Sequence, residues 1–151
     1  MSNYVELHCH SNFSLLDGAS HPEDLVKQAA SLGMPALALT DHDGLYAAVR
    51  FYKACKEAGI KPIIGAELTL ENDRHVTLLA RNNVGYSNLC RLITKAQLDH
   101  QKGSAAIDFD SLSQHSGGIF CLSGCRRGEI ASLLLSGELK QAYEAVTRCL
   151  P

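Results

Sequence analysis

Short apolar stretches alternate with helical patterns along the chain, and this alternation constrains the fold more than any other feature. Residues 36–40 form a run that is apolar up to its last residue, which is typical of a parallel strand covered on both faces. Helical patterns flank this run over residues 22–32 and 45–58, and Gly33 and Gly59 are expected to end them. The repeated order of strand and helix predicts α/β architecture with a parallel sheet.

The rest of the chain continues the alternation. Further strands are expected over residues 4–10, 62–70, 75–80 and 118–122, and further helices over 85–98, 110–115, 126–135 and 138–150. A tight turn at residues 72–74 would join two of these strands into a hairpin. A closed α/β barrel needs at least about 200 residues, whereas this chain has 151. We therefore expect one domain that is incomplete as a barrel, truncated after about five strands.

Charge and cysteine content limit the classes of function. The formal net charge is -2, and no run of Lys or Arg exceeds two residues, so the overall charge does not indicate tight nucleic-acid binding. A phosphate substrate held by metal ions stays compatible with this charge, because the ions are not counted in it. The chain has six cysteines and shows neither a signal-peptide pattern nor an apolar run that could span a membrane. We expect reduced thiols, a cytoplasmic location and no membrane association.

Side chains that bind metals occur where the expected strands end. In parallel α/β folds, functional residues lie just beyond the carboxyl ends of the strands. The residues at such places here are His8, His10, Asp17, Asp41, His42, Glu67, His75 and Cys125. His8 and His10 are two residues apart, so they face the same side of a strand. His75 begins a strand, but a hairpin would bring it to the end of the sheet where Glu67 lies.

The types of these residues predict a metal centre. Imidazole and carboxylate ligands suit zinc, manganese or iron, and a thiolate shifts the preference toward zinc or iron. The set is large enough for two or three divalent ions, with Asp17 and Glu67 as bridging ligands. Two ions about 3.5–4 Å apart can activate water and stabilise an in-line phosphoryl displacement. Asp41 is a candidate catalytic residue, or alternatively a residue that orients His42 or another ligand from behind.

Each of these motifs also occurs without a metal. A His-x-His pair, an Asp-His turn or a lone cysteine is by itself weak evidence, and a single cysteine is more often a small buried apolar residue. The prediction depends on the coincidence of several ligand types at expected strand ends.

The motifs resemble those of a known family. His8-Cys9-His10-Ser11, Leu16-Asp17-Gly18, Thr40-Asp41-His42 and Gly65-Ala66-Glu67 resemble successive motifs of the PHP (polymerase and histidinol phosphatase) family. Residues 11–20, 59–65, 78–82, 85–89, 122–125 and 128–130 resemble the N-terminal PHP domain of bacterial DNA polymerase III alpha subunits. Residues 88–94, followed by 102–104, are similar to the error-prone branch of these polymerases.

This resemblance implies a distorted (β/α) barrel of PHP type, of which residues 1–151 would be the N-terminal portion. Carried over residue by residue, it implies two or three divalent metal ions (Zn, Mn or Fe) held by His8, His10, Asp17, His42, Glu67, His75 and Cys125. In the family, an Asp-x-His pair near the end of the barrel completes the site, and this sequence is expected to end before that pair. The resemblance therefore implies a metal centre that lacks its last two ligands.

Three functions are compatible with this resemblance. The first is a phosphoesterase that hydrolyses DNA phosphodiesters at a 3′ end, as a proofreading or repair activity. The second is a small-molecule phosphatase of the histidinol-phosphate type, which the polymerase-like stretch over residues 78–130 disfavours. The third is a non-catalytic structural module of a replication protein. Expected partners are DNA or another phosphate ester, replication proteins, or a second copy that completes the barrel. A chain of this length has no room for a polymerase active site, so polymerase activity is not expected.

Overall fold

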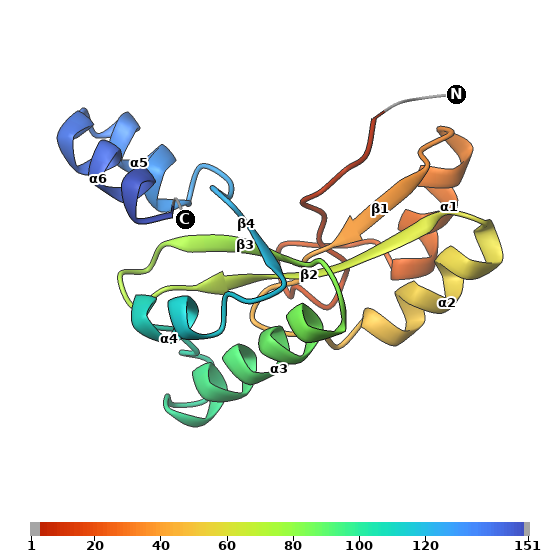
Figure 1. The fold of residues 1–151 in the computed structure, drawn as a ribbon. Helices are drawn as coiled ribbons and strands as arrows, with labels where there is room; N and C mark the ends of the chain where they lie inside the picture. Colours follow the sequence, from red (N-terminus) through yellow and green to blue (C-terminus); the bar gives the residue numbers. More distant parts are fainter. Residues whose placement is uncertain (1–3, 150–151) are drawn as a thin grey trace.

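The structure is a computed structural model that describes residues 4–149. A mixed sheet of four strands lies at its centre (Figure 1). The strands lie in the order β1-β2-β3-β4. Their bounds are Ala36–Leu39 for β1, Lys61–Thr69 for β2, His75–Ala80 for β3 and Ile119–Leu122 for β4. The α/β class that the sequence predicts is thus confirmed, although the sheet is mixed rather than parallel.

The long strand β2 pairs with two different neighbours along its length. Its first half is parallel to β1, from Ala36↔Lys61 to Leu39↔Ile64. Its second half is antiparallel to β3, from Gly65↔Leu79 to Thr69↔His75, and β3 is in turn antiparallel to β4. The segment that follows β1 continues beside β2 through an isolated parallel bridge between His42 and Glu67. Side chains from both neighbours of β2 therefore meet around its second half.

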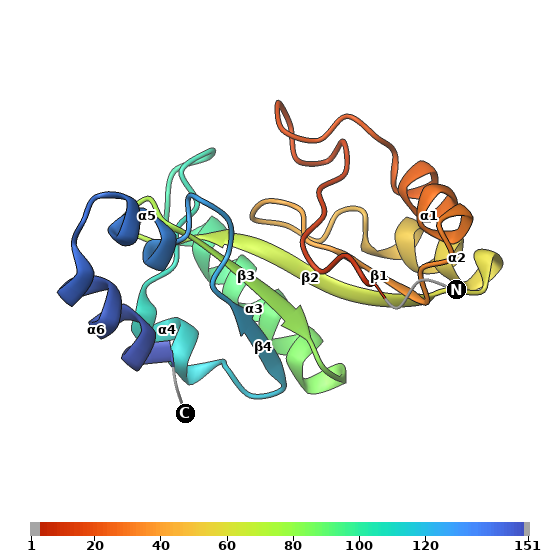
Figure 2. The same cartoon turned by 90° about the horizontal axis from the view of Figure 1, so that it is seen from above.

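Six helices are found among the described residues. Their bounds are Pro22–Ser31 for α1, Ala48–Ala58 for α2, Asn83–Leu98 for α3, Phe109–Gln114 for α4, Glu129–Leu135 for α5 and Leu139–Cys149 for α6. As the sequence predicts, Pro22 stands in the first turn of α1, and Gly59 ends α2 in the left-handed conformation with φ 71°. Helices α1 and α2 lie together near β1, α3 lies along one face of the sheet, and α5 and α6 lie at the opposite end (Figures 1 and 2).

Two apolar clusters hold the sheet to its helices. Leu68 and Leu78 from the strands pack with Leu89 and Leu92 from α3, and all four are fully buried. The second cluster joins β1 to α1 and α2, with Phe51 fully buried in it. Because side chains alternate between the two faces of a strand, the residues next to Leu68 and Leu78 face away from α3. That second face of the sheet carries the polar residues of β2 and β3.

The N-terminal segment differs from the expected strand over residues 4–10. It runs beside β1, but forms only one isolated bridge, between Glu6 and Leu37. The Thr40 hydroxyl accepts a hydrogen bond from the Cys9 amide at 3.1 Å and donates one to the Cys9 carbonyl at 3.2 Å. The Cys9 carbonyl also accepts a main-chain hydrogen bond from the Thr40 amide at 2.8 Å, whereas the Cys9 amide bonds only to the side chain, and a regular ladder does not form.

The direction of the later strands also differs from a purely parallel sheet. The turn after β2 is so short that β3 must return antiparallel, since a parallel connection needs a crossover of a dozen or more residues. The strand expected over residues 75–80 and the hairpin before it are confirmed. The expected end of the last helix at residue 150 lies outside the described residues. Within residues 4–149, no helix is long and apolar enough to cross a membrane.

Gly85 provides a test of how closely α3 packs against the loop before β4. A Cβ atom at this position would lie 1.8 Å from the carbonyl oxygen of Gly118. Replacing glycine by alanine normally stabilises a helix by about 1 kcal/mol, but here the contact with a main-chain oxygen reverses the sign. We expect Gly85→Ala to lower the free energy of unfolding by about 1–3 kcal/mol in urea denaturation. The exposed Ser87 of the same helix is the control, and Ser87→Ala should change stability by less than about 0.5 kcal/mol.

Candidate metal centre

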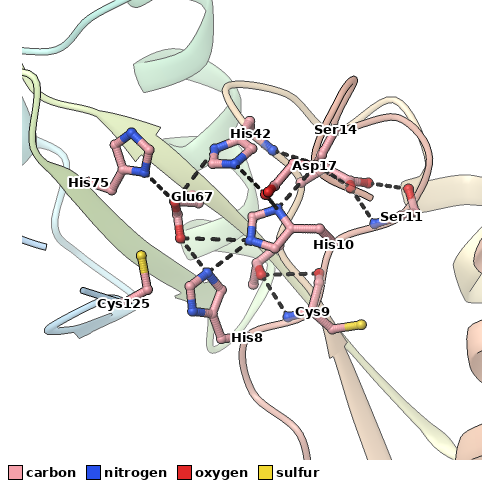
Figure 3. A network of polar contacts seen from close by, with 12 residues as sticks. His8, Cys9, His10, Ser11, Ser14, Asp17, His42, Glu67, His75 and Cys125 are labelled. Atoms are coloured by element: carbon pink, nitrogen blue, oxygen red, sulfur yellow. Dashed lines mark hydrogen bonds and ion pairs between the residues drawn. The ribbon is translucent and has the colours of Figure 1, made fainter. Parts of the chain in front are cut away.

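Glu67 lies at the centre of a ring of four histidines on the face of the sheet opposite α3 (Figure 3). Its side chain is 1% exposed. The Nε2 atom of His8 contacts Oε2, and the Nδ1 atom of His75 lies 2.5 Å from Oε1. The ring atoms of His42 and His10 lie farther out, at 3.5 and 3.8 Å from the carboxylate. A buried carboxylate is thus surrounded by four imidazoles from three segments of the chain.

The hairpin between β2 and β3 brings two of these residues together. Thr69 pairs with His75, and Glu67 pairs with Thr77, so His75 and Glu67 are two positions apart in the ladder on the same face. The expectation that a hairpin brings His75 to Glu67 is confirmed. Glu67 stands inside β2 rather than at its end, because the strand continues to Thr69.

Asp17 extends the cluster toward solvent. Its Oδ2 atom lies 3.0 Å from Nε2 of His42 and 3.8 Å from Nδ1 of His10, and its side chain is 54% exposed. The hydrogen bond with His42 lowers the pKa of Asp17, so it is ionised at neutral pH. Asp17 therefore gives the exposed side of the cluster a second negative charge.

The ligand atoms form three overlapping groups, each with all its atoms within 4.8 Å of one another. The groups are His8 with His10 and Glu67, His10 with Asp17 and His42, and His42 with Glu67 and His75. His10, His42 and Glu67 each belong to two groups. Nitrogen and carboxylate ligands in such numbers fit zinc, manganese or iron, and shared ligands are what a centre with more than one ion requires.

The electrostatics of the cluster favour a cation. Burial by itself would raise the pKa of Glu67, but hydrogen bonds from His8 and His75 and the nearby imidazoles lower it to about 2. The hydrogen bond with Glu67 raises the pKa of His8, whereas burial lowers the pKa of His10. Glu67 is consequently an anion at neutral pH, and His10 is favoured in its neutral form, which is the form that binds a metal.

Asp41 lies behind the histidines and holds the loop that carries Asp17. It is 3% exposed. Its carboxylate accepts hydrogen bonds from the amide and the hydroxyl of Ser11 and from the hydroxyl of Ser14, each at 2.7 Å. With these three donors occupying it, the carboxylate faces the loop. These hydrogen bonds are compatible with a residue that orients its neighbours, and the catalytic role of Asp41 stays a prediction.

Ser14 connects this support to the ligands. Its hydroxyl hydrogen is donated to Asp41, so toward His10 Nδ1, 3.2 Å away, the hydroxyl oxygen acts as acceptor. The same oxygen accepts a hydrogen bond from the His42 amide at 3.1 Å. Neutral His10 is therefore protonated on Nδ1, and its Nε2 lone pair points toward His8 and Glu67, as metal binding requires.

The roles of Ser11, Ser14 and Thr77 were not predicted from the sequence. Ser11 and Ser14 contact Asp41, about thirty residues later, and the Thr77 hydroxyl lies 3.5 Å from Oε2 of Glu67. The only local signal is that Ser14 follows His10 by four residues. No periodicity of the sequence links these side chains to their distant partners.

Cys125 is the one expected ligand that belongs to none of the three groups among the described residues. Its sulfur accepts a hydrogen bond from the Arg127 amide at 3.4 Å. The segment around it is nevertheless attached to the centre, because the His75 amide donates to the Arg127 carbonyl at 3.2 Å. In Figure 3, Cys125 lies on the side of the cluster formed by His8 and His75.

The chain is similar to a part of several bacterial DNA polymerases. It is 49% identical to the error-prone DNA polymerase of Symbiobacterium thermophilum over 162 residues, which covers 97% of this chain and 15% of the polymerase. It is 42% identical to the DNA polymerase III subunit alpha of Treponema pallidum and 44% identical to that of Vibrio cholerae, covering 94% and 97% of this chain. The chain spans 13% of the length of each of these two relatives.

Solved structures show the same fold at lower identity. A protein from Bifidobacterium adolescentis that is described as a metal-dependent phosphoesterase aligns with a TM-score of 0.51 and 20% identity, over 97% of this chain and 55% of that protein. A two-domain protein from Bacteroides vulgatus, described as containing a PHP-like metal-dependent phosphoesterase, aligns with a TM-score of 0.55 and 18% identity, over 88% and 41%. Residues 6–151 match the family described as PHP domain. The chain therefore belongs to the PHP domain family.

Proposed function

We propose that this chain is the N-terminal portion of the PHP domain of a DNA polymerase III alpha-like protein, and that it hydrolyses DNA phosphodiesters at a 3′ end. The observation that carries the proposal is the set of three overlapping ligand groups around Glu67. The relatives that are named DNA polymerases support DNA as the substrate. We propose that the domain works as part of a replication protein.

Six residues would hold the ions, namely His8, His10, Asp17, His42, Glu67 and His75. Bound ions would supply an activated water and would stabilise the charge of the leaving oxygen. Glu67 would link two of the groups, because it is a member of both and lies on a strand. Asp17 would close the group nearest to solvent, where a phosphodiester can enter. We also propose Cys125 as a ligand on the His75 side, supported by the main-chain bond that joins its segment to His75.

The direct test of function is hydrolysis of a single-stranded oligonucleotide labelled at its 5′ end, with protein loaded with Mn²⁺ or Zn²⁺. We expect shortening from the 3′ end that stops when the metal is chelated. Glu67→Gln keeps the shape of the side chain but removes its charge, and should lower the rate by at least about 100-fold. Full metal content without any hydrolysis would instead identify a non-catalytic module. Hydrolysis restricted to small phosphate monoesters would identify a small-molecule phosphatase.

Metal content tests the assignment of the ligands. The double substitution His8→Ala and His10→Ala removes ligands from two of the three groups. We expect the purified variant to lose most of its bound metal by elemental analysis, while circular dichroism shows that the helices remain.

The matched control replaces His100 and His115, which bond to main-chain carbonyls of Ala96 and Ser111 rather than to the centre. This control should keep the metal content of the original chain. Retention of full metal content in the His8/His10 variant would refute the assignment.

The role of Asp41 is tested by comparing two substitutions. Asp41→Ala removes the acceptor for Ser11 and Ser14, so the loop that carries Asp17 should loosen and metal content should fall. Asp41→Asn keeps one acceptor oxygen and should retain more metal than Asp41→Ala. Hydrogen exchange at the amides of residues 14–18 should quicken by about tenfold or more in Asp41→Ala. Unchanged exchange in that variant, together with lost hydrolysis, would point to a direct catalytic role for Asp41.

A further inference from the structure

Two exposed leucines lie at the tip of the loop that carries Asp17. Leu15 is 83% exposed and Leu16 is 108% exposed. Single exposed apolar residues are common on protein surfaces, but these two are adjacent and directly precede a ligand of the candidate metal centre. In Figure 2, the segment between His10 and α1 rises above the sheet.

This loop is held firmly from several sides. The Asn12 amide donates to the Ser20 carbonyl at 2.8 Å, and the Gly18 amide donates to the Ser14 carbonyl at 2.9 Å. A Cβ atom on Gly18 would lie 2.0 Å from the Ser11 carbonyl oxygen, so the two arms of the loop are in close contact. The leucines at the tip therefore have a fixed position relative to Asp17.

Phe13 anchors the loop at its base. Its ring packs against the apolar cluster beneath α1 and α2, and the guanidinium of Arg50 lies 5.8 Å from the ring centroid. The hydroxyls of Ser11 and Ser14 add the bonds to Asp41 described above. Phe13 is thus turned into the core, whereas Leu15 and Leu16, two and three residues later, are turned out of it.

The backbone of Leu16 is strained. Its φ of 67° lies in the left-handed region, which glycine and asparagine adopt far more readily than leucine. Strained conformations of this kind persist where the surrounding structure fixes them, and they cluster at functional sites. Here the strain holds a large apolar side chain out in solvent, immediately beside Asp17.

We infer that Leu15 and Leu16 form an apolar wedge that contacts the base next to the phosphodiester bound at the metal centre, an inference that rests on the proposed function. A nucleotide combines an anionic phosphate with a base that has two apolar faces, which matches a charged ligand cluster with an adjoining apolar tip. The Oδ2 atom of Asp17 lies 3.0 Å from His42, so the tip is one residue from the metal ligands. Aliphatic side chains contact and unstack bases in other nucleic-acid complexes.

The test compares binding of two oligonucleotides by fluorescence anisotropy, with metal-loaded protein and phosphorothioate linkages that resist hydrolysis. One oligonucleotide is ten thymidine nucleotides, and the other carries an abasic residue at its 3′ end. We expect the original chain to bind the base-bearing end about fivefold more tightly. The variant Leu15→Ser/Leu16→Asn should bind both about equally while keeping its metal content, because asparagine tolerates the left-handed backbone.

Two further variants separate the wedge from a general effect. Leu15→Met/Leu16→Met keeps the apolar surface and should keep the preference for the base. Leu135→Ser/Leu139→Ser removes two leucines that are 66% and 68% exposed on α5 and α6, and should also keep it.

The outcomes distinguish this inference from the function on which it rests. If the original chain binds both oligonucleotides equally, or if Leu15→Ser/Leu16→Asn keeps the preference, the wedge is refuted and the proposed function stands. If the original chain binds neither oligonucleotide, both are refuted. A variant that loses affinity equally for both oligonucleotides would place the leucines in some contact other than with the base, which also refutes the wedge.

Discussion

The burial of one carboxylate determines how the rest of this structure is arranged. Glu67 is almost inaccessible to water, and an ionised carboxylate in such a place is strongly destabilising unless it is paired and hydrogen-bonded. Its pairing comes from imidazoles, which at neutral pH are largely uncharged when unperturbed. The hydrogen bond with Glu67 raises the pKa of His8, so that protonated His8 cancels part of the charge, whereas neutral imidazoles only satisfy hydrogen bonds. A divalent cation among the same atoms would do both, and for this reason the fold and the metal centre are expected to stabilise each other.

The strand that carries Glu67 explains how residues far apart in the sequence reach it. Because β2 pairs with β1 in its first half and with β3 in its second, it brings together the segment after β1 and the start of β3. His42 belongs to the segment after β1, and His75 belongs to the start of β3. The segment after β1 continues the parallel direction with main-chain bonds from Asp43 to Glu67 and from Glu67 to Asp41. The same few bonds therefore place a ligand, its supporting carboxylate and the central glutamate.

The features that depend on local chemistry could be predicted from the sequence. The apolar run before Thr40 predicted β1, glycines predicted the ends of α1 and α2, and the turn at residues 72–74 predicted the hairpin that carries His75 to Glu67. These signals act over a few residues, where backbone preference and side-chain alternation decide the outcome. The family resemblance, carried by the motifs around His8, Asp17, His42 and Glu67, is confirmed by the match over residues 6–151.

The features that the sequence did not reveal depend on long-range partners. The expected strand over residues 4–10 is a single bridge between Glu6 and Leu37, and the Cys9 amide bonds to the Thr40 hydroxyl rather than to a main-chain group. The sequence left two roles open for Asp41, because its bonds to Ser11 and Ser14 join residues about thirty positions apart.

The proposed ligands also differ in the contacts that hold them in place. Glu67 and His75 are fixed by a ladder of strands, whereas Asp17 is placed by a loop that depends on Asp41. The segment that carries Cys125 is joined to His75 by a hydrogen bond to the Arg127 carbonyl and by an isolated bridge at Gly128. The strand-held side can therefore keep its geometry when the loops move. We expect the inner positions around Glu67 to set the affinity for metal, and the outer position at Asp17 to respond to what approaches from solvent.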